Sequence, residues 1–404
     1  MHTLGSPPIA VTPRPKTDGR FDSIDMLRGL VMILMALDHV RDFFGHVGVN
    51  PTDPALTTMP LFFTRWITHL CAPTFFLLTG LGAALSRRRR TNHELSVHLI
   101  SRGAWLIFLE IVVVRSLGLQ FNFDYRVTVL NVLWALGWSM IALAFVIQLS
   151  PRSVLLLGAA LILGHNLLDS ISASSFGSLA FVWSWLHAPG VIVARPDFTV
   201  LLAYPLVPWV GVAMVGFGLS PIYEWDAARR RRMLWRTGAG LTAAFLLLRG
   251  INVYGDFSRW APQAESWRTV LSFLNTTKYP PSLLFLLMTL GPALALLGWL
   301  DGRSPGLARP VWTFGKVPLF YFLVHLPVIH LLAILVCFLR YGSAHWMFES
   351  PDLTHFPFTQ PPGWGFDLPG VYVAWFAVVL LMYPLCRWYA AYKRERRYWW
   401  LSYL

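Results

Sequence analysis

Blocks of apolar residues, separated by shorter polar segments, recur along the chain. Most blocks are roughly 17–25 residues long, which as a helix crosses a hydrocarbon core of about 30 Å. The pattern predicts helices near residues 26–46, 66–86, 95–119, 128–149, 153–169, 200–222, 233–252, 280–300, 312–339 and 370–390. We therefore expect an all-α polytopic integral membrane protein with about ten transmembrane helices.

The composition agrees with this interpretation. Of 404 residues, 55% are hydrophobic and 13% are charged, and the mean hydropathy is +0.53. Soluble domains carry about 25% charged residues. The three cysteines, Cys71, Cys337 and Cys386, all lie in apolar segments, which argues against a disulfide framework, and no ligand spacing suggests a metal site.

The net charge of +13 is concentrated in a few segments between the predicted helices. With ten helices, these segments all lie on one side: Arg14 to Arg20, Arg87 to Arg90, Arg229 to Arg236, Arg303 to Arg309 and Lys393 to Arg397. Basic segments of membrane proteins stay in the cytoplasm, so both the N- and C-termini are predicted to be cytoplasmic. The arginine runs thus indicate topology, and we expect no nucleic-acid partner.

The chain divides into three parts. Residues 1–24 contain four prolines and no apolar core of a signal peptide, which predicts a disordered cytoplasmic tail. Residues 25–392 form a single transmembrane domain, and residues 393–404 form a basic cytoplasmic C-terminal tail.

Charged residues inside predicted spans are the best pointers to a site, because they are costly at membrane depth. On the first helix, Asp25, Arg28 and His39 lie within about 60° of one another on one face, and Arg28 and His39 are separated by about 16 Å. Asp38 points about 100° away from His39. The alternative is that Arg28 is an interfacial anchor and that the other charges mark the outer helix end.

Other polar residues in the spans have two interpretations each. Glu110 either forms a structural pair with another helix or serves chemistry. Lys278, beside Tyr279, either anchors the outer interface or binds an anionic group. His325 shares a helix face with Tyr321 and is either a packing residue or part of a site. The sequence contains no phosphate-binding loop and no serine-hydrolase elbow.

The segment from Arg20 to His39 resembles the opening helix of the heparan-α-glucosaminide N-acetyltransferase-like family of bacterial membrane proteins. Further similar segments are His69 to Gly80, Tyr204 to Gly211, Asn275 to Leu283 and Gly315 to His325. The first helix is also similar to that of the wider transmembrane acyltransferases, whose signature is an arginine, ten residues and a histidine; Arg28 and His39 fit this spacing.

The resemblance implies a membrane acyltransferase that moves an acyl group, expected to be acetyl, from cytoplasmic acyl-CoA to a hydroxyl or amine of a sugar or other envelope acceptor. It implies a site at Arg28 and His39. From the residue chemistry we expect His39 with Asp38 as catalytic residues, Arg28 as a ligand of the CoA phosphates, and no metal. The remaining substrate-binding candidates are Asp25, His69, Glu110, Lys278, Tyr279, Tyr321 and His325. The expected location is the bacterial inner membrane, with the lipid bilayer as a partner and an oligomer as an open possibility.

One departure limits the resemblance. The lysosomal heparan acetyltransferase has its catalytic histidine in the loop before the second span, whereas residues 58–65 here contain none. The heparan-type site is therefore not transferred, and heparan is not the expected substrate. The competing function is a secondary transporter or exporter, because buried His, Glu and Arg also form proton relays. The chain shows no convincing repeat of the kind transporters often have. A purely structural scaffold is the third hypothesis.

Overall fold

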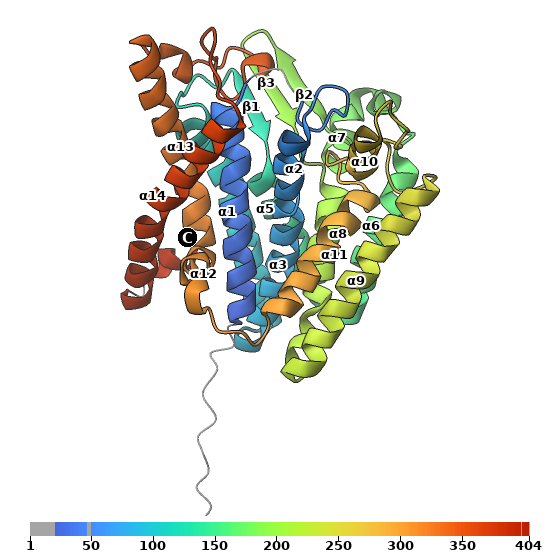
Figure 1. Cartoon of the computed structure of the whole chain (residues 1–404). Helices are drawn as coiled ribbons and strands as arrows, with labels where there is room; N and C mark the ends of the chain where they lie inside the picture. Colours follow the sequence, from blue (N-terminus) through green and yellow to red (C-terminus); the bar gives the residue numbers. More distant parts are fainter. Residues whose placement is uncertain (1–20, 47–49, 397, 404) are drawn as a thin grey trace, which may run out of the picture.

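The computed structural model describes residues 21–46, 50–396 and 398–403 (Figure 1). The predicted N-terminal tail falls outside these residues up to position 20, and the first helix already begins at Asp22. The helices are α1 (Asp22–Phe44), α2 (Met59–Thr68), α3 (Cys71–Ser86), α4 (Asn92–Phe108), α5 (Val132–Val146), α6 (Pro151–Gly164), α7 (Ala180–Leu186), α8 (Leu206–Gly218), α9 (Ala227–Ile251), α10 (Ser266–Leu274), α11 (Leu283–Leu300), α12 (Arg309–Lys316), α13 (Pro318–Tyr341) and α14 (Leu368–Glu395). The strands are β1 (Val127–Leu130), β2 (Gly190–Arg195) and β3 (Phe198–Leu202).

Among the described residues, seven helical stretches are long and apolar enough to cross a membrane. They are Met59–Arg89, Asn92–Leu119, Pro151–Leu168, Leu206–Glu224, Leu283–Leu300, Pro318–Tyr341 and Leu368–Glu395. Helices α1 and α9 have the length, at 23 and 25 residues, but both carry several charged residues. The chain is therefore a mostly helical, multi-pass membrane protein. The count of about ten spans and the cytoplasmic termini stay predictions.

A small sheet corrects the all-α expectation. Strand β3 pairs with β1 in parallel and with β2 in antiparallel orientation, in the order β1-β3-β2. The helices predicted from residues 128 and 200 therefore begin only at Val132 and Leu206. The β-branched and aromatic residues in 127–130 and 198–202 favour extended backbone, and the apolar pattern alone did not separate them from the helices that follow.

The other predicted helices also differ in detail. The second predicted helix corresponds to two helices, α2 and α3, because the regular helix is interrupted at His69 and Leu70. The third continues from α4 into π-helical turns over Leu109–Leu119. The ninth is divided at Val317 into α12 and α13. Residues 393–395 of the predicted C-terminal tail are helical and complete α14.

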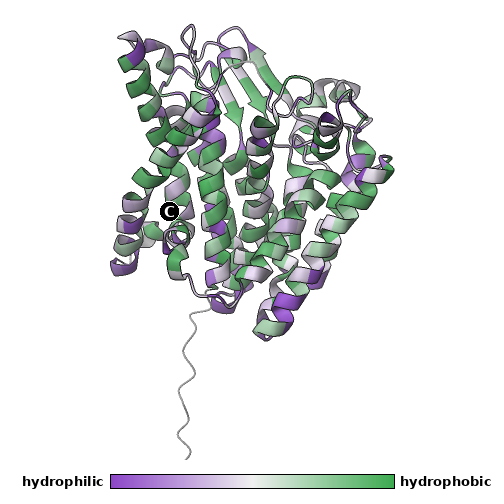
Figure 2. Ribbon diagram, viewed as in Figure 1, coloured by the Kyte–Doolittle hydropathy of each residue, from purple (hydrophilic) through white to green (hydrophobic). Residues whose placement is uncertain are grey.

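The basic segments gather at one end of the bundle. Arg88 lies 3.8 Å from Glu224, and Arg230 lies 2.9 Å from Asp301, to which the Ser23 hydroxyl also donates at 3.3 Å. We call this the basic end; α1 begins there, and hydrophilic residues mark the ends of α9 and α14 on the same side (Figure 2). The opposite end, which carries β1 to β3, is called the sheet end (Figure 1).

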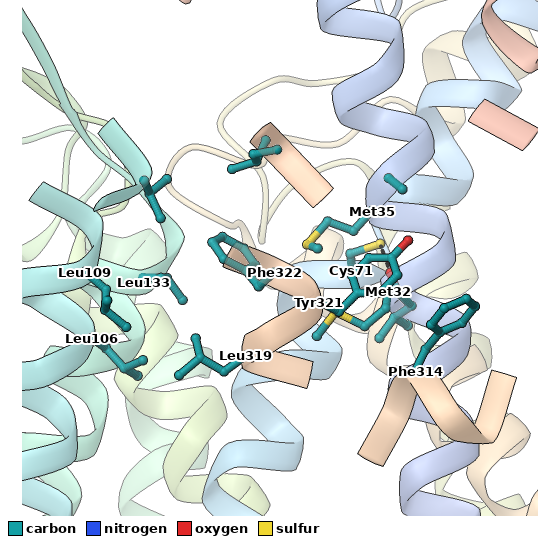
Figure 3. Packing of buried hydrophobic residues seen from close by; sticks show 14 of the residues in the cluster. Met32, Met35, Cys71, Leu106, Leu109, Leu133, Phe314, Leu319, Tyr321 and Phe322 are labelled. Carbon is teal, nitrogen blue, oxygen red and sulfur yellow. Dashed lines mark hydrogen bonds between the residues drawn. The ribbon is translucent and has the colours of Figure 1, made fainter. Parts of the chain in front are cut away.

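Helix α1 is packed inside the bundle, which lets it present polar side chains to the interior. Its Met32 and Met35 lie in a buried cluster with Tyr321 and Phe322 of α13 (Figure 3). Near the basic end α1 and α12 touch backbone to backbone, since a Cβ on Gly29 would lie 1.8 Å from the Val311 oxygen.

Candidate active site

Helix α1 connects the two ends of the candidate site. Arg28, near its start, lies 3.1 Å from Asp25 and donates to the Gly315 carbonyl oxygen at 3.3 Å. His39 lies eleven residues later, about 16 Å further along the axis. The two side chains line different cavities, Arg28 at the basic end and His39 toward the sheet end.

A cavity of about 350 Å³ opens at the basic end. Its polar lining combines four cationic side chains with three other polar groups: Arg28, Arg102, Lys316, Lys393, Thr79, Ser86 and His98. Its inner wall is apolar and includes Phe75, Val132 and Phe322. A basic mouth above an apolar wall suits a ligand with an anionic head and a less polar arm.

A central cavity of about 130 Å³ lies next to this wall, and Phe75, Val132 and Phe322 also line it. Its main polar residues come from segments far apart in the sequence: Asp38, His39, Asp42, Arg65, Glu110, Asn131, Tyr204, Lys278 and Tyr279. Three segments that are far apart in the sequence thus converge here: α1, the π-helical turns after α4 and the turn before α11.

Two arginines hold the acidic groups of α1. Arg65 of α2 donates to both oxygens of the Asp38 carboxylate. Arg41 lies 3.1 Å from the same carboxylate and donates to Asp42 at 2.5 Å. Within the described residues Asp38 forms no hydrogen bond with His39, so its structural role is to neutralise two guanidinium groups.

His39 is different from its charged neighbours. Half-buried, its imidazole forms no hydrogen bond with any part of the chain that the structure describes. Its ring lies 5.3 Å from the ring of His325, whose Nδ1 donates to the carbonyl oxygens of Tyr321 and Phe322 at 3.0 and 2.7 Å. His39 is thus held by packing while both ring nitrogens remain available to a ligand.

Glu110 is bound to the start of helix α5. Its carboxylate accepts hydrogen bonds from the backbone N–H groups of Leu133 and Trp134 at 2.7 and 3.3 Å. These N–H groups have no partner within their own helix, and a negative charge at a helix N-terminus is favourable. Arg115, five residues later, is instead 3.1 Å from Asp124. Glu110 therefore fixes α5, and with it Asn131, at the cavity wall.

A turn before α11 presents Lys278 and Tyr279 to the central cavity. Asp256 organises this turn, because its carboxylate accepts hydrogen bonds from the Thr277 N–H at 3.0 Å, the Thr277 hydroxyl at 2.7 Å and the Ser282 hydroxyl at 2.8 Å. The Tyr279 ring packs edge-on against Tyr204 at 5.3 Å. The position of Lys278 is thus determined by a hydrogen-bonded turn.

A third cavity, of about 490 Å³, lies at the sheet end. It shares His39, Asp42, Leu119 and Asn131 with the central cavity. Its other lining residues combine aromatic rings with polar groups: Phe43, Phe356, Phe366, Arg41, His46, Thr58, Gln360 and Asp367. The three cavities therefore follow one another from the basic end to the sheet end, with His39 between the second and the third.

Not all predicted site residues reach these cavities. His69 is buried with its ring 5.3 Å from Phe285, and Tyr321 and His325 are buried side by side. These three described residues line none of the three cavities. Asp25 is not among the residues that line the basic-end cavity, but it forms an ion pair with Arg28, which does line it.

Sequence reasoning missed Arg65 and Asn131 as site residues. Arg65 was placed before the second helix, whereas α2 begins at Met59 with Thr58 as its N-cap. Thr58 followed by Pro60 is a helix-start signal that the apolar pattern concealed. Asn131 lies between a strand that was not predicted and the start of α5. Within the described residues no cluster of three metal-ligating side chains is found.

A family model described as "Heparan-alpha-glucosaminide N-acetyltransferase, catalytic" matches residues 20–255. The chain belongs to this family. As a heparan-alpha-glucosaminide N-acetyltransferase family member it is a membrane protein of a transferase family. The matched region contains His39, Arg65, Glu110 and Tyr204, whereas Lys278 and Tyr279 follow it. A search of curated proteins finds no match to this chain.

Proposed function

We propose that the protein transfers an acyl group, expected to be acetyl, from cytoplasmic acyl-CoA to a hydroxyl or amine of a sugar or other envelope acceptor across the bacterial inner membrane. The observation that carries the proposal is the succession of cavities along α1. One helix contributes Arg28 to the basic-end cavity and His39 to the two cavities beyond it. Donor and acceptor then reach one histidine from opposite sides.

The basic-end cavity is the proposed donor site. CoA carries several phosphate charges, and guanidinium groups bind phosphate oxygens through paired N–H donors. Arg28, Arg102 and Lys316 line the cavity, which measures about 350 Å³. The apolar wall formed by Phe75, Val132 and Phe322 separates it from the central cavity. The pantetheine arm crosses this wall and brings the thioester to His39. The basic end faces the cytoplasm, as basic segments do.

His39 supplies the chemistry in this proposal. The acceptor oxygen or nitrogen attacks the thioester carbonyl carbon, and its proton passes to the imidazole. The carbon–sulfur bond then breaks, and the CoA thiolate takes that proton and leaves as the thiol. In the second route His39 attacks first, carries the acyl group as an acyl-imidazole and passes it to the acceptor. Both routes need an imidazole that faces the cavity, as His39 does.

The sheet-end cavity is the proposed acceptor site. At about 490 Å³ it has room for a sugar ring, and it presents aromatic rings beside carboxylate and amide groups. Phe43, Phe356 and Phe366 provide flat apolar surfaces, while Asp42 and Gln360 provide hydrogen-bonding groups. These are the contacts that a hydroxyl-rich ligand with apolar faces requires.

Release of CoA separates this proposal from its competitor, a transporter that uses the same path without acyl transfer. Purified protein in detergent is incubated with acetyl-CoA and longer acyl-CoAs, and mass spectrometry follows free CoA and acylated protein. The proposal predicts CoA release that requires the protein. If the protein neither binds acyl-CoA nor releases CoA, with or without an envelope-sugar extract, the acyltransferase proposal is wrong and transport is favoured.

A further inference from the structure

The cations around the central cavity are not equivalent. Arg65 and Arg41 both have a carboxylate partner in Asp38, and Arg41 also binds Asp42. Lys278 lines the same cavity, yet within the described part of the chain it forms no salt bridge. Its ammonium lies 5.2 Å from the centre of the Tyr279 ring. The cavity therefore contains one positive charge without a direct counterion.

The structure keeps this charge in place. Asp256 accepts three hydrogen bonds from the turn that contains Lys278, and it lies 4.0 Å from the buried Arg249. Arg249 in turn donates to the carbonyl oxygens of Ser272, Phe273 and Asn275, just before that turn. A chain of polar contacts thus connects α9 to Thr277 before Lys278 and to Ser282 after it. An interfacial anchor would not need such support.

The size of the cavity determines what Lys278 can reach. A cavity of about 130 Å³ exceeds the roughly 10–15 Å³ that one water molecule needs, so it admits a group the size of a carbonyl. Both His39 and Lys278 line this one small cavity, so a carbonyl group bound there faces both side chains. The surrounding residues include Phe75, Val114 and Leu326, so the charge acts in a poorly solvated space.

We propose that the Lys278 ammonium stabilises the negative charge that develops on the thioester carbonyl oxygen during acyl transfer. This inference rests on the proposed function and deepens it. When the nucleophile adds to the carbonyl carbon, the carbon–oxygen double bond becomes single and its electron pair moves to the oxygen. The Lys278 N–H groups donate to this oxyanion. The pair returns to re-form the double bond as the carbon–sulfur bond breaks.

His39 and Lys278 have different roles in this proposal. His39 removes the proton or forms the bond, whereas Lys278 binds only the charge that appears in the transition state. Interactions of that kind raise kcat and leave substrate affinity largely unchanged. The cations at the basic end have the opposite signature, because they hold the donor equally well before and during reaction and therefore affect KM.

The test compares Lys278→Met with the matched variant Lys316→Met, which removes a lysine from the basic-end cavity. Both are assayed for release of CoA from acetyl-CoA. Lys278→Met is expected to lower kcat by about 10²–10³-fold, the loss seen when one oxyanion donor is removed, with KM within roughly threefold of wild type. Lys316→Met is expected to raise KM and to retain kcat. Lys278→Arg keeps the charge, and its kcat should exceed that of Lys278→Met by at least about tenfold.

Thermal unfolding of the same preparations shows whether Lys278 instead has a role in the stability of the fold. If Lys278→Met is less stable than wild type, Lys278→Gln provides a second neutral variant with hydrogen-bonding capacity. The inference is overturned if a folded neutral variant retains kcat, or if Lys278→Arg fails to exceed the neutral variants. It is also overturned if the loss appears only in KM. Absence of CoA release by wild-type protein would instead contradict the proposed function itself.

Discussion

Arg28 is the residue of helix α1 that we propose contacts the acyl-CoA donor. Its guanidinium lines the basic-end cavity and is oriented by Asp25 and by the Gly315 carbonyl oxygen. We predict that Arg28→Ala raises the Kd for acetyl-CoA by about tenfold or more, the effect of losing a charge-assisted contact of about 1.5–3 kcal/mol. Folding should change less, because the side chain is partly exposed.

The control for this variant is Arg303→Ala. Arg303 is also at the basic end, but it packs over the Trp299 ring outside the basic-end cavity. Binding of acetyl-CoA by calorimetry should be unchanged in this control. Equal affinities of Arg28→Ala and wild type would make Arg28 an interfacial anchor, the alternative that the sequence left open.

The face of α1 was predictable from sequence, but the partners of its side chains were not. Helical periodicity places Asp25 and Arg28 together, and they form an ion pair. The same periodicity says nothing about which helix faces Asp38. Its partner Arg65 lies on α2 and 27 residues away, and only tertiary packing brings the two together. The catalytic role of His39 and the other site assignments remain predictions.

The crossing of α1 and α12 positions both Arg28 and the basic-end cavity. A Cβ on Gly315 would lie 1.7 Å from the Asp25 carbonyl oxygen, a backbone contact that no side-chain movement can relieve. We predict that Gly315→Ala separates the helices and lowers stability by about 1–3 kcal/mol, as overpacking does. The midpoint of thermal unfolding in detergent measures this effect.

Gly240→Ala is the matched substitution on α9. No atom lies within 4 Å of the Cβ it would add, so it should leave stability unchanged or raise it by up to about 1 kcal/mol. If both alanine variants unfold at the wild-type temperature, α1 and α12 do not make the close contact described.

Helices were predicted more successfully than their ends. Long apolar periodicity located the segments, because burial in a bilayer demands it. It did not detect β1 and β3, whose residues are equally apolar, nor the true start of α2 at Met59. The turn that carries Lys278 depends on Asp256, about twenty residues earlier in the chain, so no local pattern specifies it.

The orientation of the protein in the membrane is tested by reporter fusions. Fusions at Arg88 and Arg231, both at the basic end, should report the cytoplasm, and fusions at Ser184 and Asp352 should report the external side. The reason is the retention of basic segments in the cytoplasm. An external signal at Arg231 would reverse the orientation and would place the proposed donor site on the side that lacks acyl-CoA.

The three successive cavities differ in the chemistry of their lining residues. The basic-end cavity is lined by four cationic side chains, the central cavity by His39 and Lys278, and the sheet-end cavity by aromatic and polar groups. Neighbouring cavities share lining residues, and in the proposed function an acyl group passes from one to the next without entering the lipid. The proposed reaction between substrates on opposite sides of the membrane uses this arrangement.

The most direct test of the account is the turnover of acetyl-CoA by His39 variants. Release of CoA is measured for wild type, His39→Ala and His39→Gln, with His345→Ala, an exposed histidine in a sheet-end loop, as the control. The account predicts a loss of about 10²–10⁴-fold for both His39 variants and wild-type turnover for the control. Near-wild-type turnover of the His39 variants, with loss of activity in His69→Ala or His325→Ala, would contradict it and place the reaction elsewhere.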